Sequence, residues 1–246
     1  MNENLKSVLL LSKIVDNKLY LPDIQLDRKD YLALSKELTA LGGAWKGGKI
    51  SAFVFNFNPQ LILDRLLSDN NTNIKKSTQF FPTPNKIVKQ MLELVNINKD
   101  DTILEPSAGQ GAIIEELLKL NNNPIAFCET EEININILKE KFGNTIKQIG
   151  TNFLNVENCF FNKIIANPPF SKHQDITHIK HMFSLLDFNG SLVSLSGTSW
   201  KHNSDKKSVD FRNWLKTKDH QVIDISAGEF SSSGTQIATC IILINN

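Results

Sequence analysis

From Pro84 onward, short apolar runs alternate with amphipathic segments, and this alternation constrains the fold more than any other feature. Short apolar runs are typical of buried strands, and the segments between them have helical spacing. Strands that alternate with helices form a parallel sheet covered by helices on both faces, so we expect an α/β domain. The predicted helices are 84–95, 112–120, 131–142, 182–186 and 208–215, and the predicted strands are 102–106, 125–128, 146–149, 163–166, 191–195, 222–226 and 237–244. The last two strands, joined by the hairpin-like connection 228–234, are expected to close the sheet with an antiparallel edge.

Residues 1–70 have a different pattern, which predicts a small α+β domain. The stretch 68–77 is rich in Asn, Asp and Ser and is expected to be a linker, so the second domain covers 77–246. The elements predicted in the first domain are two strands within 7–20 around the turn Asp16-Asn17, a helix with Leu32, Leu38 and Leu41 from its cap Asp27 to Gly42-Gly43, a strand over 50–57 and a helix from Asn58-Pro59 to Leu67.

The composition is that of an ordinary globular protein. The chain has 246 residues, 41% of them hydrophobic, and a formal net charge of +1, which suits one large domain and one small domain. No apolar run is long enough to span a bilayer, and the first residues lack the features of a signal peptide, so we expect a cytoplasmic protein. Cys128, Cys159 and Cys240 are scattered, which favours reduced thiols over a disulfide or a structural metal site.

A glycine-bearing turn follows the first strand of the second domain. Gly109 and Gly111 are expected to let the backbone approach a ligand, and the next helix directs its first N–H groups to the same place. Glu129 follows Gly109 by about 20 residues, the separation at which an acidic side chain can bind a ribose diol. Glu105 adds a negative charge that would repel a pyrophosphate and attract an ammonium or sulfonium group. These residues predict a nucleoside-containing cofactor with a positive charge.

The sequence Asn167-Pro168-Pro169-Phe170 follows another apolar strand. Two prolines stiffen the chain, so the side-chain oxygen of Asn167 and the backbone oxygen of Pro168 are available to accept hydrogen bonds from a planar NH2 group. Phe170 is expected to cover the ring that carries this group. A simple proline-rich turn after a strand is the alternative.

Together, these motifs resemble the S-adenosylmethionine-dependent adenine-N6 DNA methyltransferases with an Asn-Pro-Pro-Phe motif, of the kind found in phages and plasmids. The resemblance rests on 104–111, on 167–170 and on the upstream stretch 79–84, Gln-Phe-Phe-Pro-Thr-Pro. It implies a Rossmann-like seven-stranded methyltransferase sheet. It further implies cofactor contacts from Phe81, Thr83, Glu105, Ser107, Gly109, Gly111, Glu129 and Phe153, with Phe153 packed on the cofactor adenine. Such enzymes usually have aspartate before that phenylalanine, whereas this chain has Asn152, which can accept a hydrogen bond without a charge.

The resemblance implies methyl transfer to the N6 amine of adenine in DNA, in class EC 2.1.1, as in restriction-modification systems. A base inside a duplex cannot reach the loop, so a DNA enzyme of this type must flip its target. The same loop would suit adenine or guanine amino groups of RNA, or a protein glutamine amide. A catalytically silent nucleic-acid-binding or anti-restriction module is the alternative of another class.

The expected nucleic-acid contacts lie in two places. Trp200 follows the fifth strand, where we expect it to stack on an extruded base while Lys201, Lys206 and Lys207 bind phosphates; packing on the next helix is the alternative. In the first domain, Trp45, Lys46 and Lys49 on a glycine-rich turn would supply a second contact. All histidines fall between His173 and His220, and the spacing of His173, His178 and His181 matches no zinc site, so we expect no metal.

Overall fold

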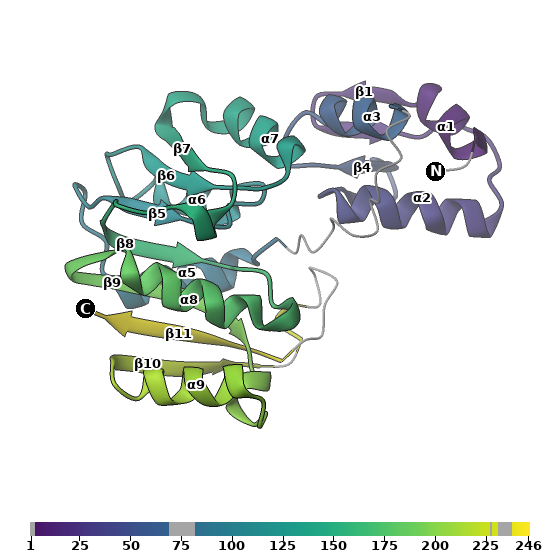
Figure 1. Ribbon diagram of the computed structural model, residues 1–246. Helices are drawn as coiled ribbons and strands as arrows, with labels where there is room; N and C mark the ends of the chain where they lie inside the picture. The colour runs from purple at the N-terminus through teal and green to yellow at the C-terminus, as the bar shows by residue number, and fades with distance from the viewer. Residues whose placement is uncertain (1–2, 69–81, 227, 231–237) are drawn as a thin grey trace. The chain divides into compact units, whose positions relative to one another are not determined.

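The computed structural model describes residues 3–68, 82–226, 228–230 and 238–246. The chain divides into two compact units, an N-terminal unit of Met1–Phe80 and a sheet unit of Phe81–Asn246 (Figure 1). The predicted linker, apart from Ser68, and the predicted cofactor residue Phe81 lie outside the described residues.

The N-terminal unit contains a four-stranded antiparallel sheet of order β1-β2-β4-β3. Residues Ser7–Leu10, predicted as strand, belong instead to helix α1, because Leu5, Val8 and Leu9 share one buried helical face. Strand β3 was not predicted, and β4 is shorter than the predicted 50–57. The elements are α1 (Glu3–Leu10), β1 (Lys13–Val15), β2 (Lys18–Tyr20), α2 (Arg28–Ala40), β3 (Ala44–Lys46), β4 (Ala52–Val54) and α3 (Gln60–Leu67).

Helix α2 begins and ends where the sequence predicts. The side chain of Asp27 accepts a hydrogen bond from the backbone N–H of Asp30 and caps the helix. At the other end, a Cβ on Gly43 would lie 2.7 Å from the ring of Phe55, so only glycine fits there. The predicted apolar face is partly wrong, since Leu34 is buried and Leu32 is exposed.

The sheet unit has the predicted Rossmann-like architecture, with seven strands in the order β10-β11-β9-β8-β5-β6-β7. Strands β9, β8, β5, β6 and β7 are parallel, and β11 pairs antiparallel with both β9 and β10. The expected antiparallel edge is therefore confirmed. The strands are β5 (Ile103–Glu105), β6 (Ile125–Cys128), β7 (Ile146–Gly150), β8 (Phe161–Ala166), β9 (Leu186–Gly197), β10 (Asp219–Ile225) and β11 (Thr239–Asn245).

Helices cover both faces of this sheet, because successive strand residues point to opposite faces. Ile103 and Ile165 pack with α5 and α6 on one face, whereas Leu104 and Ile164 pack with α8 and α9 on the other. Figure 1 shows α8 and α9 on the same side of the sheet. The helices are α5 (Asn85–Val95), α6 (Ala112–Leu117), α7 (Glu132–Phe142), α8 (Gln174–Ser184) and α9 (Lys206–Leu215), with short 3-10 turns η1 (Gly143–Thr145), η2 (Phe153–Asn155), η3 (Ser171–His173) and η4 (Ser199–Lys201).

One predicted helix of this unit was misplaced. The range 182–186 was predicted as helical, but α8 begins at Gln174 and ends at Ser184, and Leu186 opens β9. Buried Ile176, Ile179 and Met182 form the apolar face of this helix. The long segment after the Asn-Pro-Pro-Phe motif therefore packs directly on the sheet.

The chain order of the strands determines where a ligand can bind. From β5 the chain continues to β6 and β7 on one side of the sheet, and then returns to β8 and β9 on the other side. In open α/β sheets, the crevice at such a switch point, outside the carboxyl ends of the strands, is the usual ligand site. Glu105 ends β5 and Asn167 follows β8, so the two predicted motifs meet at this crevice.

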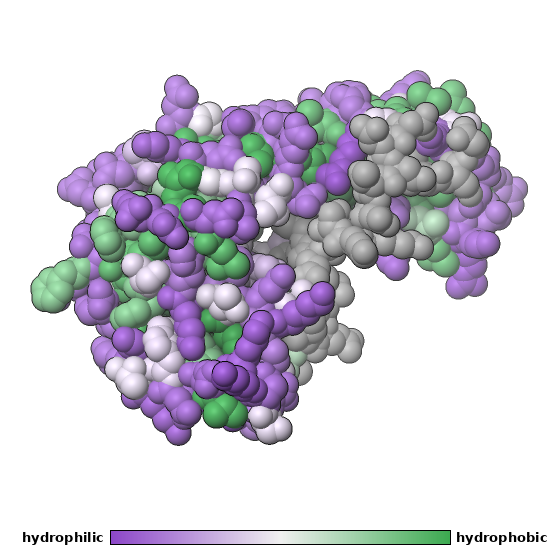
Figure 2. Space-filling model, in the orientation of Figure 1, coloured by the Kyte–Doolittle hydropathy of each residue, from purple (hydrophilic) through white to green (hydrophobic). Residues whose placement is uncertain are grey.

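One face of the described residues is largely polar. Figure 2 shows a face on which hydrophilic residues predominate and hydrophobic residues form small separate groups. None of the helices in the described ranges has the length and apolar character needed to cross a membrane.

Candidate active site

The turn after β5 is fixed to the neighbouring strand by its backbone. The N–H of Ala108 donates to the carbonyl of Cys128 at 3.0 Å, and Gly111 N–H donates to the carbonyl of Ala108 at 2.8 Å. Both Gly109 (φ 52°) and Gly111 (φ 84°) have left-handed backbone conformations that favour glycine. These bonds place the turn beside the end of β6.

Gly111 has a packing role in addition to the ligand approach predicted for it, which stays a prediction. A Cβ at this position would lie 2.4 Å from the Phe142 ring and 2.8 Å from Leu138 Cδ2, both on α7. Glycine is therefore required here for the packing of α7 against the turn.

Glu129 holds the same turn from the end of β6. One carboxylate oxygen accepts from Gly109 N–H at 2.7 Å, and the other accepts from Glu131 N–H at 2.8 Å. Burial raises the pKa of Glu129, and the hydrogen bonds from Glu131 and Gly109 oppose that rise. Each carboxylate oxygen has more than one lone pair, so Glu129 can accept further hydrogen bonds, including those of a diol.

Glu105 is the most deeply buried carboxylate of the site, with 2% of its surface exposed. Burial raises its pKa well above the ordinary range, the charge of Glu129 raises it further, and a hydrogen bond from the backbone of Ile114 opposes the rise. Within the described part of the chain, its Oε2 has no hydrogen-bond partner. A buried carboxylate oxygen without a partner is costly unless a ligand completes it, and a cationic group is the matching ligand. Ser107 lies half-buried on the same turn.

The Asn167 side chain is oriented by a residue from far along the chain. Its Nδ2 donates to the hydroxyl Oγ1 of Thr83 at 3.1 Å. Thr83 is itself buried, just before α5. This bond assigns the amide nitrogen to Thr83, so Oδ1 is the atom with which Asn167 can accept from an amine.

The other residues of the motif are held by packing against the sheet and its helices. Pro168 is buried, and Pro169 and Phe170 are half-buried. Phe170 packs against the core cluster of α5 and α6, and its ring lies 3.8 Å from the Cβ position of Gly197, at the end of β9. The loop is therefore built on the ends of two parallel strands, β8 and β9.

The structure buries Phe153, whereas the contact of Asn152 with the cofactor adenine stays a prediction. Phe153 is 2% exposed. The centroid of its ring lies 4.7 Å from that of the His181 ring and 5.5 Å from that of the His178 ring, both on α8. The expectation that Phe153 packs on a cofactor adenine is therefore wrong for this structure, because α8 covers the ring. Asn152 is exposed, caps η2 by accepting from Leu154 N–H at 3.1 Å, and lines a cavity of about 460 Å³.

Trp200 also faces inward. It is 5% exposed, donates its indole N–H to Ser196 Oγ at 3.0 Å and packs edge-on against Phe211 of α9 at 5.0 Å. The expectation that it stacks on an extruded base is wrong, and packing on the following helix is what the structure shows. Lys201 pairs with Asp224. Lys206 and Lys207 are exposed in the first turn of α9.

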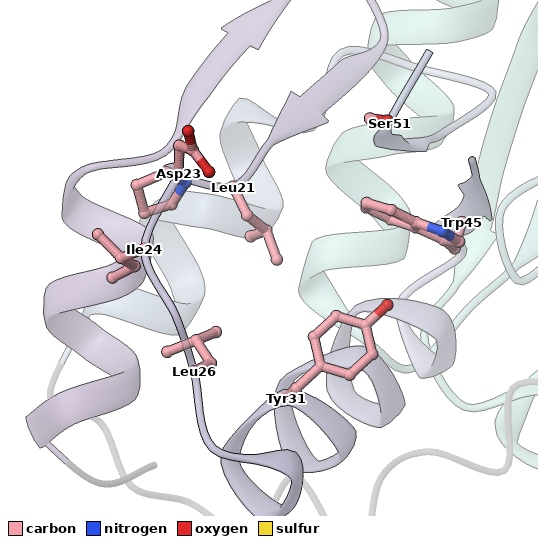
Figure 3. Close-up of a pocket in the computed structure, with 8 residues that line it drawn as sticks. Leu21, Asp23, Ile24, Leu26, Tyr31, Trp45 and Ser51 are labelled. Carbon is pink, nitrogen blue, oxygen red and sulfur yellow. The ribbon is translucent and has the colours of Figure 1, made fainter. Parts of the chain in front are cut away.

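In the N-terminal unit, Trp45 and Lys46 lie on strand β3, and only Lys49 is in the turn. Trp45 is 43% exposed and lines a cavity of about 410 Å³. Figure 3 shows its ring and that of Tyr31 opposite the aliphatic residues of this cavity, which are Leu21, Ile24 and Leu26. Lys46 and Lys49 are exposed next to it in the sequence.

His178 and His181 of α8 pack against Phe153, and His173 precedes the helix. His181 Nε2 is 2.9 Å from the carbonyl of Val156, and His173 lies 3.5 Å from Asp205. Among the described residues, no group of three or more His, Cys, Asp or Glu side chains could hold a metal ion. Sequence reasoning missed Asp175, a buried carboxylate whose only sequence signal is an acidic residue in a largely basic segment.

Comparison with known proteins gives partial matches, and no family model matches the chain. An rRNA adenine N-6-methyltransferase of Bacteroides fragilis is 28% identical over 125 residues, which cover 50% of this chain and 47% of the relative. The type II methyltransferase M.HincII of Haemophilus influenzae is 31% identical over 103 residues, 42% of this chain and 19% of the relative. The chain thus matches less than half the length of either relative.

Among solved structures, the chain is similar to a protein assigned as the modification subunit of a type I restriction enzyme from Vibrio vulnificus. The TM-score is 0.57 at 15% identity, and the match covers 75% of this chain and 47% of the other. At this identity the likeness shows the fold, which is the Rossmann-like α/β fold with a seven-stranded mixed sheet.

Proposed function

We propose that this chain transfers a methyl group from S-adenosylmethionine to the exocyclic N6 amine of adenine in DNA. The observation that carries this proposal is the position of Asn167, which Thr83 orients at the same crevice as the unpartnered carboxylate oxygen of Glu105. A hydrogen-bond acceptor for an amine, Asn167, and a site for a cation, Glu105, therefore lie at the ends of the neighbouring strands β8 and β5. The names of the two relatives, both methyltransferases and one acting on adenine, support the same chemistry.

The cofactor site is formed by the ends of β5 and β6. Glu105 suits the positively charged methionine end of S-adenosylmethionine, because a buried carboxylate oxygen that has no hydrogen-bond partner among the described residues gains most from a cation. Glu129 suits the ribose diol, and its bond to Gly109 N–H keeps the turn in place. When bound, S-adenosylmethionine would supply an electrophilic methyl group on a sulfonium, whose sulfur–methyl bond breaks to leave the neutral thioether of S-adenosylhomocysteine.

Asn167 and Pro168 act on the acceptor amine. The lone pair of an exocyclic amine is conjugated into the base, so accepting both of its N–H groups at Asn167 Oδ1 and Pro168 O favours a more nucleophilic nitrogen. The amine becomes positively charged as it gains the methyl group, and the two oxygens stabilise that charge. Its proton then leaves to water, so no strong base is required, and orientation supplies much of the rate. Phe170 lies beside these atoms and would cover the ring of the base.

RNA is the second candidate substrate, favoured by the similarity to the rRNA adenine N-6-methyltransferase of Bacteroides fragilis. Either nucleic acid must present an unpaired base. A duplex substrate would need base flipping, which costs a few kcal/mol. Because Trp200 is buried, another group must hold the strand.

The N-terminal unit supplies that contact in our proposal. The exposed Trp45 and the half-buried Tyr31 pack edge to face in one cavity, and aromatic rings stack on bases of any sequence. Lys46 and Lys49 are exposed close by in the sequence and suit phosphates. With Lys206 and Lys207 on the sheet unit, they make up the cations assigned to the nucleic acid.

The decisive experiment is incubation of the protein with radiolabelled S-adenosylmethionine and separate pools of DNA, RNA and protein, followed by nucleoside or amino-acid analysis. We expect label in N6-methyladenine from DNA. Label in RNA adenine or guanine would favour the second candidate, and label in glutamine would indicate a protein substrate. No label in any pool, despite cofactor binding, would indicate a catalytically silent nucleic-acid-binding module.

Asn167→Ala tests the site itself. Loss of a transition-state hydrogen bond of this kind costs on the order of 10²–10³ in rate. Calorimetry should find cofactor affinity nearly unchanged, because Asn167 acts on the amine. As a matched control, Asn155→Ala changes an exposed asparagine of η2 and should leave the rate as it is. Equal rates for Asn167→Ala and wild type would end the assignment.

A further inference from the structure

Asp175 is a buried carboxylate to which the proposed reaction assigns no part. It lies in the first turn of α8, shortly after the Asn-Pro-Pro-Phe motif, and 3% of its surface is exposed. Its Oδ2 accepts from Ser196 Oγ at 2.7 Å and from Gly197 N–H at 3.0 Å. Ser196 Oγ in turn accepts from the indole N–H of Trp200. One carboxylate therefore ties the start of α8 to the end of β9.

This tie lies directly against Phe170. A Cβ on Gly197 would be 3.8 Å from Asp175 Oδ2 and equally 3.8 Å from Phe170 Cδ2. The carboxylate, the strand end and the aromatic ring thus meet at one point. The loop that contains Asn167 leaves β8, which pairs with β9, and enters α8 at Asp175. The end of the loop at α8 is consequently bonded to β9, the strand next to β8, from which the loop begins.

The energetics argue for a positional role. A buried carboxylate is expensive, and replacing a buried charge by apolar groups is often neutral or stabilising. Burial raises the pKa of Asp175, while hydrogen bonds from Ser196, Ile176 and Gly197 oppose the rise. Among the described residues its Oδ1 has no hydrogen-bond partner. Such a group contributes little to stability, but its charge-assisted bonds are short and directional.

We propose that Asp175 is a positioning residue for the acceptor loop, which holds Phe170 and Asn167 in place through its bonds to Ser196 and Gly197. This inference rests on the proposed function. Without the carboxylate, the start of α8 can shift relative to β9, and the loop loses its fixed far end. A shift of about 1 Å at a reacting group can cost on the order of 10²-fold in rate.

Kinetics test the proposal with a graded series. We expect Asp175→Ala to lower kcat by on the order of 10- to 10²-fold, with the dissociation constant for S-adenosylmethionine unchanged. Asp175→Asn keeps an oxygen that can accept from Gly197 N–H, and should recover part of the rate. Asp210→Ala, which removes an exposed carboxylate of α9, is the control and should have wild-type kcat.

Hydrogen exchange supplies a readout that does not depend on activity. In Asp175→Ala the amides of Asn167, Phe170 and Ser171 should exchange faster, while those of β6 keep their wild-type protection. If the wild-type protein methylates nothing, but the loop amides of Asp175→Ala still exchange faster, the positioning role stands and the proposed function is wrong. An active wild type together with unchanged loop exchange and kcat in Asp175→Ala would overturn the positioning role alone. A uniform rise in exchange across the sheet unit would also overturn it, since Asp175 would then serve general stability.

Discussion

The hydroxyl of Thr83 and the amide of Asn167 are joined by a 3.1 Å hydrogen bond, although 84 residues separate them in the chain. The bond determines which end of the amide faces the crevice. The contact of Thr83 with the cofactor stays a prediction, and the structure adds a direct link from Thr83 to the acceptor loop. We therefore predict that Thr83 couples the cofactor and acceptor positions through one side chain.

Thr83→Val should remove this orientation while keeping the shape of the side chain. A hydrogen bond of this kind contributes about 1 kcal/mol, so we expect kcat to fall by roughly fivefold. Thr83→Ser keeps the hydroxyl and should retain most of the rate. Steady-state kinetics at saturating cofactor provide the measurement, and equal rates in the valine and serine variants would contradict the coupling.

The sequence predicts the sheet unit well, because its strands are buried apolar runs with distinct polar or proline residues at their ends. Strand β6 has the predicted bounds, Ile125–Cys128, since an apolar run lies between a proline and an acidic residue. Prediction failed at Ser7–Leu10, where a short apolar run fits a strand or a helix equally well. The helix is favoured by the burial of Leu5 and Leu9 together, which is a tertiary effect.

The site was predictable in its motifs but not in its side-chain directions. The glycine turn and the Asn-Pro-Pro-Phe loop meet because both follow central parallel strands. The sequence places Trp200 at the end of a strand, but the side of the sheet that the ring faces depends on Phe211, its partner in α9. The burial of Phe153 by α8 and the tie made by Asp175 similarly depend on packing between distant segments.

The affinity for S-adenosylmethionine should depend on the ionisation of Glu105. Its raised pKa means that the carboxyl binds a proton at pH values where an ordinary glutamate is ionised. A cation binds the ionised form, so affinity should increase as pH rises through this pKa and decrease as pH falls. Calorimetry across pH should show this slope in wild type and a weaker, flat profile in Glu105→Gln. Glu93→Gln, at an exposed position of α5, should behave as wild type. A sloping profile in Glu105→Gln would assign the proton to another group.

His178 should make the folded state sensitive to acid. Burial, together with the charge of the neighbouring His181, lowers the pKa of His178 from 6.5 to about 4, so the ring is neutral in the folded protein above that pH. Between these values the unfolded chain binds the extra proton, and the free energy of unfolding therefore falls as pH decreases from about 6.5 to about 4. The loss should approach about 3 kcal/mol.

Urea denaturation at several pH values, for wild type and His178→Phe, provides the test. The phenylalanine keeps a ring against Phe153 but cannot titrate, so its unfolding free energy should fall less in acid. His220→Gln, at an exposed histidine, is the control and should follow wild type. Parallel curves for His178→Phe and wild type would show that His178 does not carry the effect.

Trp200→Ala should act on stability rather than on substrate binding. Removal of a large buried aromatic side chain costs about 3–5 kcal/mol, and here it also leaves Ser196 without its indole donor. Trp200→Phe keeps the contact with Phe211 and should lose less. Thermal denaturation, followed by activity at a temperature where each variant is folded, separates the two effects. A Trp200→Ala protein of wild-type stability with weakened nucleic-acid binding would restore the stacking role.

Trp45 should be the aromatic residue that contributes to nucleic-acid affinity. Its ring is 43% exposed beside Tyr31, and stacking on a base contributes about 1–3 kcal/mol. Trp45→Ala should therefore weaken binding of single-stranded DNA by roughly 5- to 150-fold, measured by fluorescence anisotropy with labelled oligonucleotides, whereas cofactor affinity should not change. Leu32→Ala removes another exposed apolar side chain of the N-terminal unit and serves as the control. Lys46→Ala and Lys49→Ala should each reduce the dependence of affinity on salt, because each removes one phosphate contact. Equal affinity of Trp45→Ala and Leu32→Ala for DNA and RNA would exclude the cavity of Figure 3 as the contact surface.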